Sequence, residues 1–451
     1  MKLIFSTFVL SYAAVALAET PSLVDNVTLE QNSASAVVTV SYDLAAPAIV
    51  TLDVFTNGVS IGATNLRRLA GDVNRKVPDG TGRKIFWSPL DSFREQHVTD
   101  GSMTAVVTAW SEGNPPDYLV VDLSVTNCLR YYVSAEALPF DVTNDVYKLD
   151  CLVMRRIHAT GVPWRMGTPR KETGAEANEV SDLSIPHQVV LTNDYYIGVF
   201  EVTERQYYLL AGGVFGGAGS ATALEGNAFR IGSWADYFDG SKMLPAEKMS
   251  YNQLRGSGAL WPANGHQVGV DGYLHMARQL TGLKNLDLPT EAQWEFACRS
   301  GYGTSYSTGT DCIRAFDASG NDTALDRVAW YGSAYNGTVP KTDVRPRAVG
   351  TKDANGWGLY DMHGNVFEMC LDWYSSGDAY RATFAPGWAA GEPTIEPAGP
   401  NTGTQRVFRG GDYYNSASRL RASYRYTWTT FGSDFKYEHN GFRLACVIEG
   451  K

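Results

Sequence analysis

The sequence predicts an α+β protein in which an all-β unit precedes a longer unit of low regular-structure content. Alternating β-branched runs occur within residues 19–113, whereas three capped helix starts lie beyond residue 200. The 45 glycines and the aromatic content of 12% indicate many turns packed around buried rings. A chain of 451 residues allows two or three domains, since a domain commonly holds roughly 100–200 residues.

Residues 19–113 are expected to form a β-sandwich. Turn residues bound the β-branched runs, such as Asn57-Gly58 and the glycine-rich stretch 79–82. The length and the strand spacing suit a sandwich of immunoglobulin-like type, which we interpret as a spacer or adhesion unit. The expected strands are residues 36–42, 49–55 and 103–110.

A domain boundary is predicted at Asn114-Pro115-Pro116, where the strand pattern breaks. Residues 114–150 are expected to hold a linker and the first strands of the second unit, beginning with a strand over 118–123. The second unit itself is expected to cover residues 151–451.

Three helix starts in the second unit share one capping chemistry. Thr203, Ser250 and Thr290 are each followed three residues later by glutamine. The hydroxyl can accept from the third backbone N–H while the glutamine reaches back to the cap residue. The first of these helices should stop at Gly212-Gly213 and the third near Gly301, and a further short helix is expected over 272–280.

The first eighteen residues are typical of a secretory signal peptide. Met1-Lys2 precedes an apolar run over 3–17, and Ala16-Leu17-Ala18 forms an A-x-A cleavage site. We expect cleavage after Ala18 and therefore a secreted or periplasmic protein; the alternative is an uncleaved membrane anchor. No later segment is long and apolar enough to predict a transmembrane helix.

The charge balance argues against nucleic acid as a partner. The formal net charge is -10 and the pI is about 5.3. Binding to a phosphate backbone needs a basic face, and no stretch is dense in lysine and arginine. The hydrophobic content of 44% and the charged content of 19% also separate this chain from disordered proteins.

Six ordered segments of the second unit resemble the formylglycine-generating enzyme, or sulfatase-modifying factor, family. The glycine pair Gly410-Gly411 opens the most informative of them. The resemblance spans about 165 to 447 and implies a C-type-lectin-like fold with buried aromatic rings. The segments are residues 164–167, 196–207, 288–299, 355–368, 409–425 and 440–444.

The resemblance also shows a departure from the family's copper chemistry. In active aerobic members, two cysteines after the glycine pair hold Cu(I), a soft metal that prefers thiolates. Asn415 and Leu420 stand at those positions, so we expect neither copper binding nor oxidation of a sulfatase cysteine. Iron is not expected either, because related sulfoxide synthases hold it with a three-histidine set in a helical domain that has no counterpart here. We interpret His363 as a structural hydrogen-bond partner.

Calcium is the cofactor that the resemblance implies. Asp361 and Glu368, with the backbone carbonyls of Gly364 and Val366, fall where the family holds a calcium ion, and hard cations favour such oxygen ligands. The alternative is that the two carboxylates cap local backbone N–H groups without a metal.

The even number of cysteines predicts disulfide bonds in an exported chain, with fifteen possible connectivities. Cys128 and Cys151 flank a loop of plausible length for a local bridge. The resemblance favours a disulfide between Cys298 and Cys446, which leaves Cys312 and Cys370 as the third pair. The alternative for each cysteine is a buried free thiol.

The segment after the glycine pair would line the cleft that holds the active site in the related enzymes. Tyrosine, serine and asparagine are typical of adaptable recognition surfaces, so we expect a protein, peptide or glycan ligand. The alternatives are that the tyrosines are core rings, or that the chain is a divergent oxidoreductase or an enzyme of sulfatase maturation. The predicted cleft residues are Asp412, Tyr413, Tyr414, Asn415, Ser418, Leu420 and Tyr424.

Overall fold

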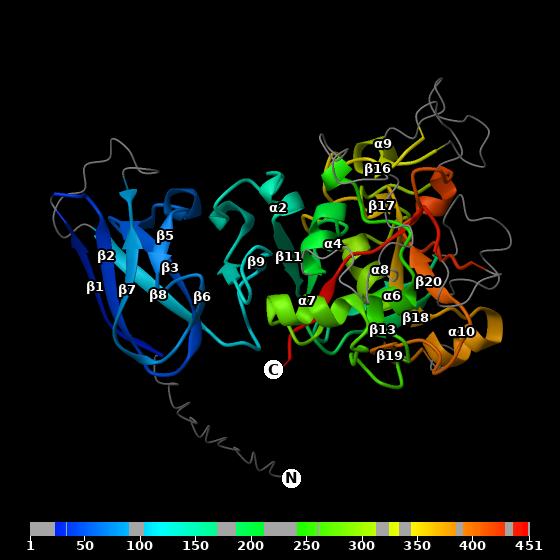
Figure 1. Cartoon of the computed structure of the whole chain (residues 1–451), viewed down its shortest axis with the longest axis horizontal. Coiled ribbons are helices and arrows are strands. Elements are labelled where there is room, and N and C mark those ends of the chain that lie inside the picture. Colours follow the sequence, from blue (N-terminus) through cyan, green and yellow to red (C-terminus); the bar gives the residue numbers. More distant parts are fainter. Residues whose placement is uncertain are drawn as a thin grey trace, which may run out of the picture.

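The computed structural model divides into a smaller β-unit and a larger mixed unit lying side by side along the longest axis (Figure 1). No helix in the described residues is long and apolar enough to cross a membrane. The predicted signal peptide lies outside the described part. The structure describes residues 23–32, 34–89, 103–168, 186–211, 241–258, 261–312, 324–332, 344–384, 391–428 and 436–449.

The described residues of the first unit form two four-stranded sheets. One has the order β1(Val24–Gln31), β2(Val38–Leu44), β7(Gly80–Trp87) and β5(Leu69–Gly71). The other joins β3(Ala48–Thr56) to β8(Met103–Trp110), β4(Val59–Ser60) and β6(Arg75–Val77). The three predicted strands therefore exist. The predicted turn over 79–82 is shorter than expected, because a bend lies at Asp79 and β7 already begins at Gly80, where it pairs with β2.

The core of the first unit follows from the alternation of its strands. Along β2, every second side chain is buried, from Val38 through Val40 and Tyr42 to Leu44. These side chains pack with Val50 and other residues of the facing sheet in one hydrophobic cluster. Burial of one face per strand is what a two-sheet arrangement requires.

The second unit is built around a six-stranded sheet. Its order is β10(Leu129–Tyr132), β9(Tyr118–Asp122), β11(Cys151–Ile157), β14(Tyr195–Gly198), β22(Ala445–Val447) and β15(Leu286–Asp287). The two strands of the 114–150 segment thus form one edge of this sheet. The C-terminal strand β22 pairs with β14 and with β15, which forms the other edge of the sheet.

Three smaller sheets complete the strands of the second unit. The most buried is β20(Arg406–Arg409), β18(Phe367–Trp373) and β21(Asn440–Gly441), in which every residue of β18 is buried. The second pairs β16(Ala329–Trp330) with β17(His363–Gly364). The third is β12(Pro163–Met166), β13(His187–Val190) and β19(Thr394–Ile395).

The helices of the second unit are short, and the predicted capping is confirmed. Complete capping boxes start α4(Glu204–Leu210), α6(Tyr251–Arg255) and α8(Glu291–Arg299). The fourth expected helix is α7(Tyr273–Thr281), which ends at Gly282 in the left-handed conformation. The other helices of the described chain include α2(Val146–Leu149), α9(Leu325–Val328), α10(Gly377–Phe384) and the 3₁₀ turns η1(Ala63–Leu66), η2(Ala135–Ala137), η4(Ser241–Met243) and η7(Ala417–Leu420).

Substitution of the cap of α8 should have a measurable cost. The Thr290 hydroxyl accepts from the backbone N–H of Gln293, and the Gln293 side chain accepts from the Thr290 N–H. We expect Thr290→Ala to lower the free energy of unfolding by about 1 kcal/mol, measured by urea denaturation. Thr290→Ser is the matched control because it keeps the accepting hydroxyl. Equal losses in the two variants would contradict a capping role.

None of the six cysteines forms a disulfide bond, although all of them lie in the described residues. Cys128 and Cys151 stand on opposite sides of β9, since the Asp122 N–H donates to the Cys128 carbonyl while Cys151 pairs with Asp122 from β11. Two strand spacings separate them by about 10 Å, beyond the reach of a disulfide. The predicted Cys128–Cys151 disulfide is therefore not formed in this structure.

The other two predicted bridges are absent as well. Cys298 lies on α8 with its thiol near the Met362 carbonyl and the His363 ring, whereas Cys446 lies on β22 in a different hydrophobic cluster. Cys370 packs in the cluster of α8, and Cys312 packs in a third cluster with Leu420. The elements named by the resemblance are present, but the two cysteines of each predicted pair lie in different hydrophobic clusters.

Candidate functional site

Helix α8 anchors the glycine-pair segment through buried ion pairs. The Arg425 guanidinium donates to both Glu291 oxygens at 2.5 and 2.8 Å, and Arg409 donates to Glu295. All four side chains are at most 3% exposed. Paired charges of this kind tolerate burial because each charge keeps its hydrogen bonds. The arginines at both ends of the segment 409–425 are therefore structural.

The glycine pair lets the segment pass close to the turn at residues 362–366. Gly410 and Gly411 have φ of 92° and 74°, and the Gly410 carbonyl accepts from the Gly364 N–H at 2.8 Å. A Cβ on Gly411 would come within 2.7 Å of Leu420 Cδ1, and one on Gly364 within 3.0 Å of Leu420 Cδ2. The two glycines thus form a cradle for the leucine side chain.

Leu420 fills that cradle completely. It is 0% exposed and packs with Tyr306, Cys312 and Ala417 in a small hydrophobic cluster. At a position where the related enzymes place a copper ligand, this chain has an alkyl group without a donor atom. Leu420 therefore belongs to the core and is not a residue that lines an open cleft.

Only part of the predicted cleft segment is accessible. Asp412, Tyr413, Ser418 and Tyr424 are buried, at 9% exposure or less. Tyr414 is 69% exposed, and Asn415 is partly exposed beside it. Of the residues predicted to bind a ligand, only those in the short loop around Tyr414 are therefore accessible to one.

This loop is held in place by hydrogen bonds. Asp412 Oδ1 accepts from the backbone N–H groups of Tyr414 and Asn415 at 2.9 and 2.8 Å, and also from the Asn415 amide. The Asn415 carbonyl accepts from the Gly332 N–H at 2.9 Å. Asn415 thus serves as a loop anchor.

The structure adds His439 to this site. Its Nδ1 lies 2.7 Å from Asp412 Oδ2, and its ring centroid lies 4.6–5.7 Å from those of Tyr413, Tyr414 and Tyr437. A carboxylate at Nδ1 fixes the tautomer, so Nε2 carries the lone pair and can accept a proton or a ligand hydrogen bond. Sequence reasoning missed His439 because 27 residues separate it from Asp412.

His363 has the structural role that we predicted. Its Nδ1 lies 2.7 Å from the Leu420 carbonyl, and its Nε2 accepts from the Ser307 N–H at 3.0 Å. Burial lowers the pKa of His363 to about 4. The imidazole is therefore neutral at physiological pH and connects the 362–366 turn to the loop that carries Leu420.

The predicted calcium ligands do not form a cation site as they are arranged. Both oxygens of Glu368 accept from Arg443 at 2.5 Å, and Oε2 also accepts from the Trp294 indole at 2.7 Å. Asp361 Oδ2 accepts from the Gly350 N–H, while its buried Oδ1 has no hydrogen-bond partner. A calcium ion shared by these carboxylates would have to displace the guanidinium, so calcium stays a prediction that this geometry does not support.

A third carboxylate belongs to the same buried region. Glu201 accepts from Val366 N–H and from the Asn365 amide. Burial, followed by the charges of Asp361 and Glu368, raises the pKa of Glu201 well above its usual range. Burial likewise raises the pKa of Asp361 to about 6. No group of three or more histidine, cysteine, aspartate or glutamate side chains in the described residues is arranged to hold a metal ion.

These features define an α+β domain of short strands, held together by buried arginine–carboxylate pairs around a glycine-pair segment. Residues 159–448 match the model of the sulfatase-modifying factor enzyme 1-like domain family. The chain therefore belongs to this family.

Relatives with assigned activities match only part of the chain. The formylglycine-generating enzymes of Thermomonospora curvata and Streptomyces coelicolor are 33% and 34% identical to it over 171 and 168 residues, or 35% of this chain in each case. The matched part covers 48% and 46% of those enzymes, about half their length. Among solved structures, Treponema denticola variable protein 1 aligns over 66% of this chain and 95% of its own, with 20% identity and a TM-score of 0.42.

Proposed function

We propose that the chain is an exported ligand-binding member of this family that does not carry out copper-dependent oxidation. The observation that carries the proposal is the Leu420 side chain, which is buried between Gly411 and Gly364. Copper oxidation in the family needs two thiolates after the glycine pair. The amide of Asn415 is a poor ligand for Cu(I), and Leu420 has no donor atom.

The proposed binding face is the loop around Tyr414, in a domain for which we propose a C-type-lectin-like fold. Tyr414 offers a rigid and largely exposed ring, while Asn415, Ser416 and Arg419 add polar groups beside it. Because Asp412 holds the loop through its backbone N–H groups, little conformational entropy would be lost on binding. A protein, peptide or glycan ligand suits this combination of an aromatic anchor and small polar groups.

The first unit has a separate proposed role. We propose an immunoglobulin-like spacer that presents the second unit outside the cytoplasm, after removal of the signal peptide. The divergent oxidoreductase is less well supported, because its metal would need a donor set that the described side chains do not assemble.

Copper uptake tests the proposal directly. We expect the wild-type chain to take up no stoichiometric Cu(I) in an anaerobic titration against a chromogenic Cu(I) chelator. Burial disfavours the native thiols as substitutes, because Cu(I) binds the thiolate form and burial raises the pKa of Cys298 above its usual range and that of the partly exposed Cys151 to about 12. The double variant Asn415→Cys/Leu420→Cys should gain one tightly bound Cu(I), because it restores the thiolate pair.

The single variant Asn415→Cys is the matched control, since it adds a thiol without opening the cradle. Circular dichroism would establish that the double variant folds, because removal of leucine atoms from a core costs stability. Uptake of one Cu(I) per wild-type chain, or turnover of a sulfatase-type cysteine peptide by it, would overturn the proposal.

A further inference from the structure

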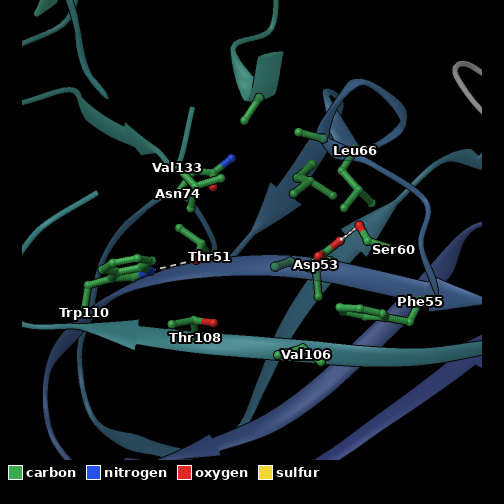
Figure 2. A pocket seen from close by; sticks show the side chains of 14 residues that line it. Thr51, Asp53, Phe55, Ser60, Leu66, Asn74, Val106, Thr108, Trp110 and Val133 are labelled. Atoms are coloured by element: carbon green, nitrogen blue, oxygen red, sulfur yellow. Dashed lines mark hydrogen bonds between the residues drawn. The ribbon is translucent and has the colours of Figure 1, made fainter. Parts of the chain in front are cut away.

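The first unit contains a pocket on the outer face of its β3–β8 sheet. Its volume is about 280 Å³, near the lower end of the sizes of small-molecule sites. Thr51, Asp53 and Phe55 from β3 line it together with Thr108 and Trp110 from β8. Figure 2 shows Trp110 and Phe55 toward opposite ends, with Asp53 between them. The volume of the pocket suits a small molecule that contains one five- or six-membered ring.

The position of this pocket follows from strand register. Thr51 pairs with Thr108 and Asp53 with Val106, so these side chains share one face of the sheet. The alternate residues Val50 and Val54 point into the core between the sheets. An outer face usually carries polar side chains, whereas this one carries Phe55, Val106 and Trp110. Apolar side chains on a face that points away from the core indicate that this face contacts another part of the protein or a ligand.

The second unit closes one side of the pocket. Val133 and Ala137 line it opposite the sheet. Two hydrogen bonds join the units nearby, from the Tyr131 N–H to the Asn74 carbonyl at 2.8 Å and from the Arg67 guanidinium to the Glu136 carbonyl at 3.2 Å. The walls of the pocket therefore come from two units that are fixed to each other, which is a common setting for ligand sites.

The polar groups in the pocket include both donors and acceptors. Asp53 Oδ1 accepts from the Ser60 hydroxyl at 2.8 Å, and no bond to its Oδ2 is formed within the described chain. Thr51 Oγ1 accepts from the Trp110 indole at 2.8 Å, so its own proton is left to donate. Thr108 adds a hydroxyl and Asn74 an amide. A ligand here must accept as well as donate.

We propose that this pocket binds a single sugar ring, either free or at the end of a glycan. A pyranose has an apolar C–H face that can pack on the Trp110 ring and hydroxyl groups that donate to Asp53 and accept from threonine or asparagine. A simple amine would supply donors only and would leave the Thr51 and Asn74 protons without acceptors. The mixture of polar groups is therefore the reason for choosing a sugar.

Saturation-transfer NMR on the full chain tests this site. The probes are methyl glycosides of glucose, galactose, mannose and N-acetylglucosamine at millimolar concentration, with benzylamine as the amine comparator. We expect at least one glycoside to receive saturation. Trp110→Ala should weaken its binding by about tenfold or more, because it removes the stacking surface, and Thr108→Val by about fivefold, because it removes one hydrogen bond.

Phe86→Ala is the matched control. Phe86 is an aromatic residue of the same unit that is 40% exposed and does not line the pocket, so this variant should bind as the wild type does. Thr108→Val keeps the test decisive if Trp110→Ala fails to fold, because it preserves the size of an exposed side chain. The proposal is overturned if no glycoside binds, if benzylamine binds in their place, or if neither variant weakens binding. Binding of a free methyl glycoside with no response to a polymeric glycan would assign the site to free sugars.

Discussion

Arg443→Met is expected to lower the free energy of unfolding by about 3–5 kcal/mol, because it leaves a buried carboxylate without its cation. Arg443 and Glu368 are both 0% exposed and joined by two hydrogen bonds of 2.5 Å. Arg443 also donates to the Gly198 and Tyr360 carbonyls at 2.9 Å. These bonds connect the segment 440–444 to β18, to β14 and to the loop at Tyr360. Their loss should be visible in urea denaturation followed by circular dichroism.

The effect of Arg443 extends beyond its direct partner. Glu201 and Asp361 lie in the same buried region, and the charge of Arg443 lowers the pKa of each while burial raises it. Without the guanidinium, three carboxylates would have to share one buried site, and like charges at short range disfavour ionisation. We therefore expect the variant to be most unstable at high pH, where all three tend to ionise.

Two further variants give the Arg443 experiment its controls. Arg443→Met/Glu368→Gln should recover at least half of the loss, because it removes the unpaired charge, and this variant stays informative if the single variant does not fold. Arg327→Met breaks a pair with Asp353 whose side chains are 71% and 56% exposed, so it should change stability by no more than about 0.5 kcal/mol. A loss below about 1 kcal/mol for Arg443→Met would contradict the assignment.

Local chemistry explains which elements could be predicted from the sequence. The capping boxes at Thr203, Ser250 and Thr290 involve residues only three positions apart, and all three formed as expected. Strand β7 was not predicted, because Gly80 and Gly82 resemble a turn and its pairing with β2 depends on residues about forty positions away. Periodicity identifies strands that alternate, and β7 shows little alternation until Ile85.

The candidate site was predictable only in outline. The glycine pair located it, and the loss of a donor atom at Leu420 was visible in the sequence. The burial of Leu420 was not, because the cradle combines Gly411 with Gly364 from a distant turn. The contact between His439 and Asp412 also depends on how β21 places residue 439 beside β18. No short-range pattern carries such information.

The missing disulfides and the buried ion pairs have a common explanation. The second unit has short helices and strands, so its loops need fixed points in the core. Arg409, Arg425 and Arg443 supply these points, each bound to a buried carboxylate and to backbone carbonyls. The two members of each bridge predicted beyond residue 290 lie in different hydrophobic clusters, and none of these four cysteines takes part in the ion pairs. Buried charge pairs thus connect the loops of this domain to its core.

Lowering the pH from about 6.5 to 4 is expected to destabilise the fold through His363. Its folded pKa of about 4 lies below the ordinary histidine value of about 6.5, so the unfolded chain binds the extra proton in this window. The His363 contribution is fully present above about 6.5 and falls by about 3 kcal/mol as the pH drops to 4. The physical reason is burial, which disfavours a charged imidazole. A charged ring would also lose the hydrogen bond that it accepts from the Ser307 N–H.

The His363 contribution is isolated by comparing variants, because Asp361 and Asp372 act in the opposite direction. Burial raises their pKa values to about 6 and about 8, so each makes the fold less stable as the pH rises. Denaturation of His363→Gln between pH 4 and 7 should lack the acid loss seen in the wild type, since a neutral amide can keep one donor and one acceptor in place. His275→Gln, at a partly exposed position on α7, should keep that loss. If His363→Gln and the wild type lose stability in parallel on acidification, another group is responsible, and the neutral imidazole between Leu420 and Ser307 is not the acid-sensitive point of the fold.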